Sequence, residues 1–141
     1  MNRNIKYKIS DLFDKLTVLQ LKQLDSNTKY KNFEKTIELI IKEIDSTYLS
    51  SNKNFYFDSK IIRLIIILTQ INTYIWLLRS EISKTDKSLN NNMKISHQLN
   101  ALRNIAKNGL SLIFSNSDKA AVRTNTNKED LKGWKFSLLN E

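Results

Sequence analysis

Residues 60–83 read KIIRLIIILTQINTYIWLLRSEIS, and this stretch decides the fold class. Its first half is apolar on nearly every side, which is typical of a buried helix but also of a buried strand. The second half continues the apolar pattern at steps of three and four residues, over a length well beyond that of an ordinary strand. The stretch therefore predicts a long central helix, buried on most sides, with Asp58 or Ser59 as its N-cap.

The apolar part of this stretch, residues 61–78, approaches the length of a membrane span, which needs about twenty mainly apolar residues. Arg63, Gln70 and Asn72 interrupt it, and lysines flank it on both sides. We therefore predict a helix of a packed bundle without membrane contact. Residues 1–8 lack the apolar segment and the cleavage site of a secretory signal, so we expect a cytoplasmic protein.

The rest of the chain carries three more apolar stripes at helical spacing, within residues 11–24, 30–48 and 95–113. Ser10 can cap the first of these helices, and the polar residues 84–92 predict a loop before the last. Proline is absent and glycine occurs only twice, so the residues that punctuate hairpins and sandwiches are missing. We therefore predict an all-α bundle of about four main helices.

The C-terminal part predicts one or two additional short helices, at residues 118–124 and 127–133. A length of 141 residues is that of one domain, so we expect residues 1–141 to form a single helical domain. The chain has no cysteine, which excludes a disulfide framework and a thiolate metal site.

The net charge of +9 is concentrated in the second half of the predicted bundle, where residues 84–123 hold seven Lys and Arg against two Asp and Glu. Such an excess is expected of a protein that meets phosphate or another anion. A compositional bias towards lysine and asparagine explains the charge equally well.

The familiar catalytic and cofactor-binding signatures are missing. One histidine, no cysteine and two glycines exclude thiol nucleophiles, histidine-pair zinc sites and glycine-rich phosphate loops. His97 has no evident partner, and Glu34 and Glu38 share a helix face with Lys42, as on a solvated surface. We expect no metal and no cofactor, and the sequence leaves open whether the protein is an enzyme.

The basic helix predicted at residues 95–113 carries a polar stripe that suits an anionic ligand. Amides and cations alternate along it, and Lys119 and Arg123 extend the charge beyond it. The stripe consists of Asn100, Arg103, Asn104 and Lys107. A solvated helix face shows the same pattern.

Polar residues also interrupt the apolar stretch 60–83, where burial is costly unless each polar group is paired. Asn72, Trp76 and Arg79 lie at spacings of four and three, on one face of the predicted helix. Potential partners on the first helix are Asp14, Lys15, Thr17 and Lys22. One interpretation is a network between helices in which Asp14 pairs with Arg79 or Arg123. The other is a pocket for an anionic ligand, lined by Trp76.

Three blocks of the sequence resemble a family of small uncharacterised bacterial helical proteins. Residues 14–22, DKLTVLQLK, are similar to the DKLTILEIK signature that opens this family. Asn72-x-x-Ile75-Trp76 resembles its Asn-x-x-Leu-Trp block, and residues 116–127 resemble its Asn-Asp-x-Arg-Ala-Ala-Ile-Lys-x-x-Ile-Asn block.

The resemblance implies a helical fold and no established activity, in a family suspected of serving surface-glycan or sugar-nucleotide pathways. The positions that it highlights are Asp14, Lys15, Lys22, Trp76, Asn116, Lys119 and Arg123. Arg79 stands where the family has an acid, and Ser117 where it has an aspartate, so a site that depends on those acids is altered here.

Three functions fit these observations. The first is a non-catalytic binding protein whose basic helices contact a polyanion, with nucleic acid as the favoured partner. The second is an enzyme or sensor for a nucleotide or nucleotide sugar, bound near Asp14, Trp76 and Arg123. The third is an adaptor or oligomer subunit that uses an exposed part of the surface of residues 61–78.

Overall fold

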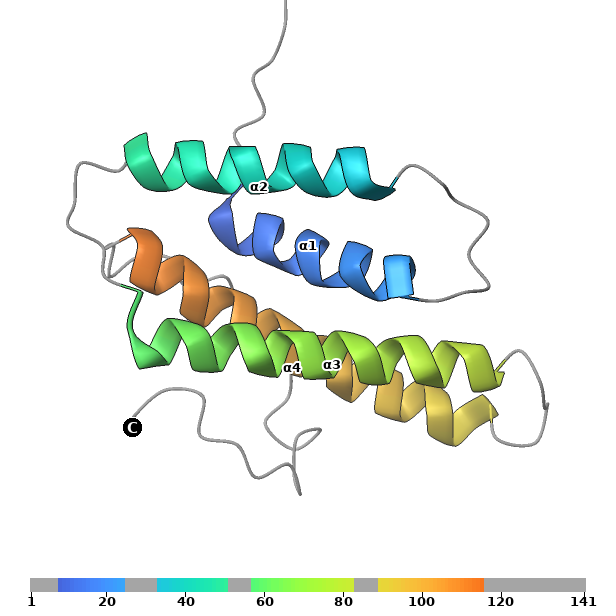
Figure 1. Cartoon of the computed structure of the whole chain (residues 1–141). Coiled ribbons are helices and arrows are strands. Elements are labelled where there is room, and N and C mark those ends of the chain that lie inside the picture. Colours follow the sequence, from blue (N-terminus) through green and yellow to red (C-terminus); the bar gives the residue numbers. More distant parts are fainter. Residues whose placement is uncertain (1–7, 25–32, 51–56, 83–88, 116–141) are drawn as a thin grey trace, which may run out of the picture.

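The computed structural model describes residues 8–24, 33–50, 57–82 and 89–115. These residues form four α-helices, and no strand occurs among them. The helices are α1 (Ile9–Leu24), α2 (Phe33–Ser50), α3 (Ser59–Ile82) and α4 (Leu89–Ser115). Successive helices run in alternating directions (Figure 1). The prediction of an all-α bundle of about four main helices is confirmed.

The central helix of the bundle is α1, not α3 as the sequence predicts. α1 contacts each of the other three helices, α3 and α4 form the most extensive pair, and α2 packs chiefly on α1. Figure 1 shows this order, with α1 between α2 and the α3–α4 pair. A helix that is apolar nearly all round fits a central position, but α3 leaves part of its apolar surface exposed and α1 takes the place between the others.

Three apolar clusters hold the helices together. The first joins α1, α3 and α4 and contains Ile9, Phe13, Ile61, Leu64, Leu68, Ala106 and Leu110. The second joins α3 and α4 and contains Ile71, Ile75, Leu78, Leu99 and Leu102. The third joins α1 and α2 and contains Leu12, Leu19 and Ile40. The clusters fix the rotation of α1 so that its polar residues at positions 14 and 17 also face inward.

The N-terminal ends of the helices test the predicted caps. Asp58 caps α3, because its Oδ1 accepts a hydrogen bond of 3.0 Å from the backbone N–H of Ile61. The predicted cap at Ser10 is wrong. α1 begins at Ile9, and the carbonyl of Lys8 accepts the first backbone bonds of the helix. Ser10 is buried within the first turn instead.

The predicted loop at residues 84–92 is too long at its C-terminal end, because α4 already begins at Leu89. Three asparagines therefore belong to the first turn of a helix, where the backbone N–H groups have no partner inside the helix and asparagine is well tolerated. The predicted short helices at residues 118–124 and 127–133 lie outside the described residues.

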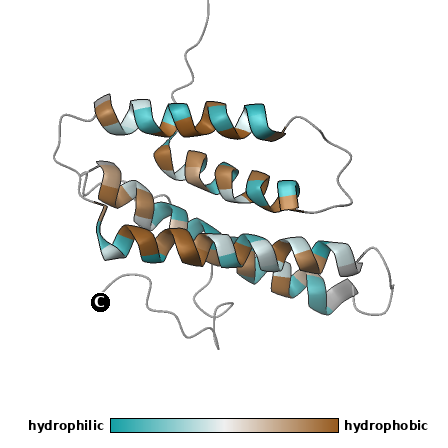
Figure 2. Ribbon diagram, viewed as in Figure 1, coloured by the Kyte–Doolittle hydropathy of each residue, from teal (hydrophilic) through white to brown (hydrophobic). Residues whose placement is uncertain are grey.

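α3 is the one helix within the described ranges that is long and apolar enough to cross a membrane. Its stretch Ser59–Ser80 contains an 18-residue window with a mean hydropathy of 1.8, and 39% of that window is buried. The core helix of a bundle has the same length and composition, so this property is weak support for a span. In Figure 2 the first half of α3 is largely brown, the colour of apolar residues.

Candidate functional site

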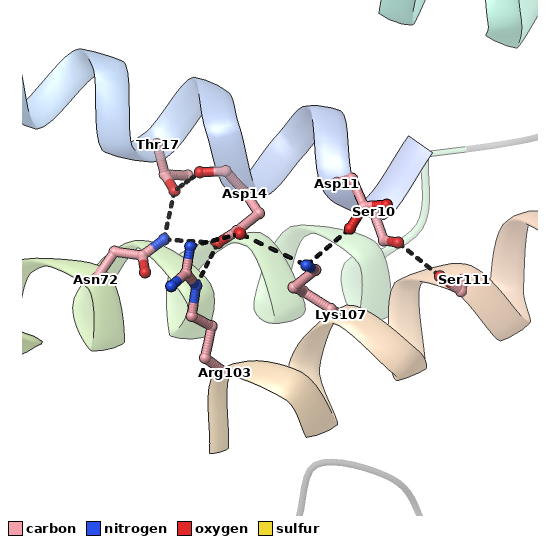
Figure 3. Close-up of polar contacts among 8 residues, drawn as sticks. All are labelled: Ser10, Asp11, Asp14, Thr17, Asn72, Arg103, Lys107 and Ser111. Atoms are coloured by element: carbon pink, nitrogen blue, oxygen red, sulfur yellow. Dashed lines mark hydrogen bonds and ion pairs between the residues drawn. The ribbon is translucent and has the colours of Figure 1, made fainter. Parts of the chain in front are cut away.

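Asp14 is the one charged side chain that is buried among the residues the structure describes. It lies on α1, where the helix faces both α3 and α4, and polar side chains from both neighbours point at it (Figure 3). Its surroundings are set by the apolar clusters on either side, which bring the three helices into contact at this level. A buried carboxylate is costly unless it is paired, so its partners define the site.

The main partner of Asp14 is Arg103 of α4. The guanidinium donates two bonds, from Nε to Oδ1 at 2.8 Å and from Nη2 to Oδ2 at 2.6 Å. This two-pronged geometry is the strongest that an arginine and a carboxylate form. The side chain of Arg103 is 27% exposed and that of Asp14 is 9% exposed, so the pair lies at the inner edge of the surface.

Asn72 of α3 completes the inner side of the site. Its Nδ2 donates to Asp14 Oδ1 at 3.0 Å and to Thr17 Oγ1 at 2.7 Å. The hydroxyl of Thr17 donates in turn to the backbone carbonyl of Asp14 at 2.8 Å. The polar residue in the middle of the apolar stretch of α3 is thus paired, as its burial requires.

A second ion pair extends the site towards the N-terminal end of α1. Lys107 Nζ lies 2.7 Å from Asp11 Oδ1 and 3.6 Å from Asp14 Oδ2. One turn further, the hydroxyls of Ser10 and Ser111 share a hydrogen bond of 2.6 Å. Two carboxylates of α1 therefore face two cations of α4, and the charges of this interface balance.

The pKa of Asp14 reflects two opposing effects. Burial alone raises it, because the ionised carboxylate loses hydration. The hydrogen bonds from Arg103 and Asn72, together with the positive charges of Arg103 and Lys107, outweigh burial and lower the pKa below its ordinary value of 3.8. Asp14 is therefore ionised at neutral pH and is a weaker base than an ordinary aspartate.

At Asp14 the structure shows a network between helices, which is the first of the two interpretations of this polar group. The partner is not Arg79, which is exposed near the end of α3. Arg79 follows Asn72 by seven residues, or about 10 Å along the helix axis, so it cannot meet the carboxylate that Asn72 contacts. Arg123, the other predicted partner, lies outside the described residues, as do Asn116 and Lys119.

The remaining residues that the sequence places near Asp14 are less buried than Asp14 is. Trp76 is half-buried, one turn beyond Asn72 on α3, and Lys22 is half-buried near the end of α1. Lys15 is exposed. The pocket interpretation requires these side chains to surround an open ligand site together with Asp14, whose two oxygens already accept bonds from α3 and α4.

The predicted stripe of α4 divides into an inward and an outward part. Arg103 and Lys107 turn to α1 and bind its carboxylates, whereas Asn104 is exposed. Asn100 is half-buried, and its Nδ2 donates to the carbonyl of Ser96 in the preceding turn at 3.0 Å. The four residues therefore do not form one free anion-binding surface.

Sequence reasoning missed the pairing of α1 with α4, although a signal for it exists. Asp11 and Asp14 lie three residues apart on one helix, and Arg103 and Lys107 lie four apart on another. Each pair lies on one face of its helix, and the two helices are antiparallel. The two acids of α1 can therefore meet the two bases of α4 in reverse order along the chain, at similar spacing. The contact of Ser10 with Ser111 has no comparable signal, because a serine of this kind reads as a helix cap.

The chemistry that this arrangement supports is structural. In the described part of the chain no three His, Cys, Asp or Glu side chains come together as a metal would require. Asp14 has both oxygens engaged and a lowered pKa, so it does not suit a general base. The network binds three helices to one another around a buried charge.

Comparisons of the chain with protein-family models, with curated proteins and with solved structures gave no match. The resemblance of three sequence blocks to a helical bacterial family therefore stays a prediction. In the structure the first two of these blocks meet, because Asp14 and Thr17 both bind Asn72.

Proposed function

We propose that this chain is a non-catalytic binding protein that contacts a polyanion, with nucleic acid as the favoured partner. The observation that carries the proposal is the net charge of +9. Polyanions bind to such proteins through cations that displace condensed counterions, and no reactive group is needed. The closed network around Asp14 is consistent with this, since the most promising acid of the chain serves to hold helices together.

The distribution of the charge indicates where the contact lies. Eleven of the 23 basic and eight of the 14 acidic residues fall within the described ranges, so six of the nine excess positive charges belong to the other residues. Of the cations on α4, Arg103 and Lys107 are neutralised by α1, and Lys94 is exposed. We place the contact at Lys94 of α4 and at Lys119 and Arg123, which follow α4 in the chain.

Binding of labelled single- and double-stranded nucleic acid, measured over a series of salt concentrations, tests the proposal. The affinity should fall steeply as the salt concentration rises. In a plot of log affinity against log salt concentration, each phosphate neutralised on B-form DNA should contribute about −0.9 to the slope. The double variant Lys119→Gln, Arg123→Gln should weaken binding and reduce this slope by up to about two. No binding of either nucleic acid at low salt would contradict the proposal.

A matched control removes two charges elsewhere. Lys35 and Lys42 are both exposed on α2, whose described residues carry more acids than bases. The double variant Lys35→Gln, Lys42→Gln should bind as the unmodified chain does. An equal loss in both double variants would mean that the contact is diffuse and is not centred on α4 and the residues after it.

A further inference from the structure

The side of α3 that faces away from α4 is exposed and apolar. Ile62, Ile66 and Leu77 are each about half exposed, at 49%, 51% and 52%. Buried residues of α3 point to α1 and α4, so these side chains have no apolar cover within the described bundle. From residue 62 to residue 77 the surface extends about 22 Å along the helix.

The spacing on this side is that of a helix-pairing seam. Residues 62, 66, 69, 73 and 76 follow one another at steps of four and three, which is the heptad pattern of paired helices. We call the side chains Ile62, Ile66, Thr69, Thr73, Trp76 and Leu77 the α3 seam. The pattern favours a partner helix, since only a helix meets such a row along its whole length.

The two threonines do not disturb the seam. Thr69 Oγ1 donates to the carbonyl of Ile65 at 2.8 Å, and Thr73 Oγ1 donates to the carbonyl of Thr69 at 2.9 Å. Both hydroxyls are therefore satisfied within α3, so a partner that covers the seam needs no polar groups to match them.

We propose that the α3 seam pairs with the α3 seam of a second copy of this chain, in antiparallel orientation about a two-fold axis between residues 69 and 70. Such an axis places Ile62 opposite Leu77 of the second copy and Ile66 opposite its Thr73, so apolar groups meet towards both ends of the seam. The same contacts occur twice, as in any interface that a two-fold axis generates. The proposal rests on exposed apolar residues and is independent of the proposed contact with a polyanion.

The charged residues beside the seam complement those of a second copy in this orientation. Arg63 and Tyr74 are exposed on one flank, and Asp58 and Arg79 are exposed on the other. In an antiparallel pair each flank meets the same flank of the second copy. Arg63 then comes within one helical turn of the Tyr74 ring of the second copy, where a cation–π contact forms, and Asp58 comes within one turn of its Arg79.

A parallel pair of the same helices joins unlike flanks, so it brings Arg63 near Asp58 of the second copy and Tyr74 near its Arg79. The side-chain charges are therefore complementary in both orientations, and the helix dipoles distinguish them. The antiparallel pair opposes the two helix dipoles, which the parallel pair aligns. The apolar row and the charged flanks of α3 therefore complement a second copy of α3, and the opposed helix dipoles favour the antiparallel orientation.

The first test is the mass of the full chain in solution, by sedimentation equilibrium over a range of concentrations. We expect a reversible monomer–dimer equilibrium. Ile66→Arg places two like charges beside the axis and should raise the dimer dissociation constant by about 30-fold or more. Leu39→Arg introduces the same side chain at a site of α2 that is 65% exposed and away from the seam, and it should leave the equilibrium unchanged.

The second test uses the absence of cysteine from the chain, because a single introduced thiol can then be followed without background. A mixture of Ile62→Cys and Leu77→Cys chains should form a disulfide-linked heterodimer under mild oxidation. Ile62→Cys alone should not, because its two copies lie about 22 Å apart in the antiparallel pair and a disulfide needs Cα atoms within about 7 Å.

Three results would overturn the proposal. The first is a strict monomer at every concentration, which would leave the seam to another occupant. The second is a dimer that Ile66→Arg does not weaken, which would place the interface elsewhere. The third is efficient cross-linking of Ile62→Cys with itself, which would show the parallel orientation.

Discussion

At the scale of single residues, Asp14 is the side chain on which the arrangement of three helices depends. It accepts bonds from α3 through Asn72 and from α4 through Arg103, and it belongs to α1. A hydrophobic contact tolerates small rotations of a helix, whereas this set of directed bonds does not. Removal of any one partner leaves buried polar groups unpaired, which makes the network costly to break and specific in its geometry.

The lowered pKa of Asp14 predicts how its contribution to stability varies with pH. Because the pKa is lower in the folded state than its ordinary value of 3.8, Asp14 contributes fully above 3.8, and its contribution is lost as the pH falls through the lower folded-state value. Asp14→Asn should lower the free energy of unfolding by about 2 kcal/mol at pH 7. The difference from the unmodified chain should shrink as the solution is acidified below pH 3.8.

Urea denaturation at a series of pH values measures this difference. The control is Asp45→Asn, which removes the same charge from an exposed position of α2. It should change the stability at pH 7 by less than about 0.5 kcal/mol. A destabilisation by Asp14→Asn that stays constant from pH 7 to pH 2 would mean that the ionised carboxylate is not what the network stabilises.

At the scale of the elements, local sequence determines where α3 begins. Asp58 satisfies a backbone N–H of the first turn, and Ser59 becomes the first residue of the helix. α1 has no such side-chain cap, because Ser10 is turned to Ser111 of α4. A serine that could cap a helix by its place in the sequence thus joins two helices instead, because a serine of α4 lies beside it.

Loss of the α3 cap gives a prediction at this scale. Asp58→Ala should lower the free energy of unfolding by about 1 kcal/mol, because a backbone donor of the first turn loses its acceptor. Ser59→Ala should have a smaller effect, since Ser59 lies inside the helix. Thermal unfolding of both variants distinguishes them, and equal effects would contradict the assignment of Asp58 as the cap.

At the scale of the whole molecule, the bundle is uneven. Among its described residues α2 contributes one buried apolar residue, Ile40, and it packs chiefly on α1, whereas α3 and α4 share the most extensive contact. Segments with few buried contacts open at lower free energy than the rest of a protein. The amide protons of α2 should therefore exchange with solvent faster than those in the middle of α3 and α4.

Native-state hydrogen exchange, followed by mass spectrometry or NMR, measures this order. Ile40→Ala should accelerate exchange in α2 more than in the α3–α4 pair, since Ile40 joins only the cluster between α1 and α2. Equal protection in all four helices, or equal acceleration by Ile40→Ala, would show that the bundle opens only as a single unit.

Much of this architecture follows from the sequence, because helical periodicity and N-caps are local properties. The apolar steps of residues 60–83 and the acid at position 58 are sufficient to predict α3. Asn72 also follows, since a polar group in so apolar a stretch needs a partner, and Asp14 and Thr17 are among the partners that the sequence offers on α1.

Only the tertiary structure decided which helix is central and which cation neutralises Asp14. α3 is apolar nearly all round, so its pattern does not say which sides meet neighbours, and one side stays exposed. Arg103 and Asp14 are 89 positions apart in the sequence. The choice of Arg103 over Arg79 therefore depends on how α1 and α4 are rotated and aligned against each other. Periodicity is fixed within a helix, but the pairing of side chains between helices arises only when their apolar faces have packed.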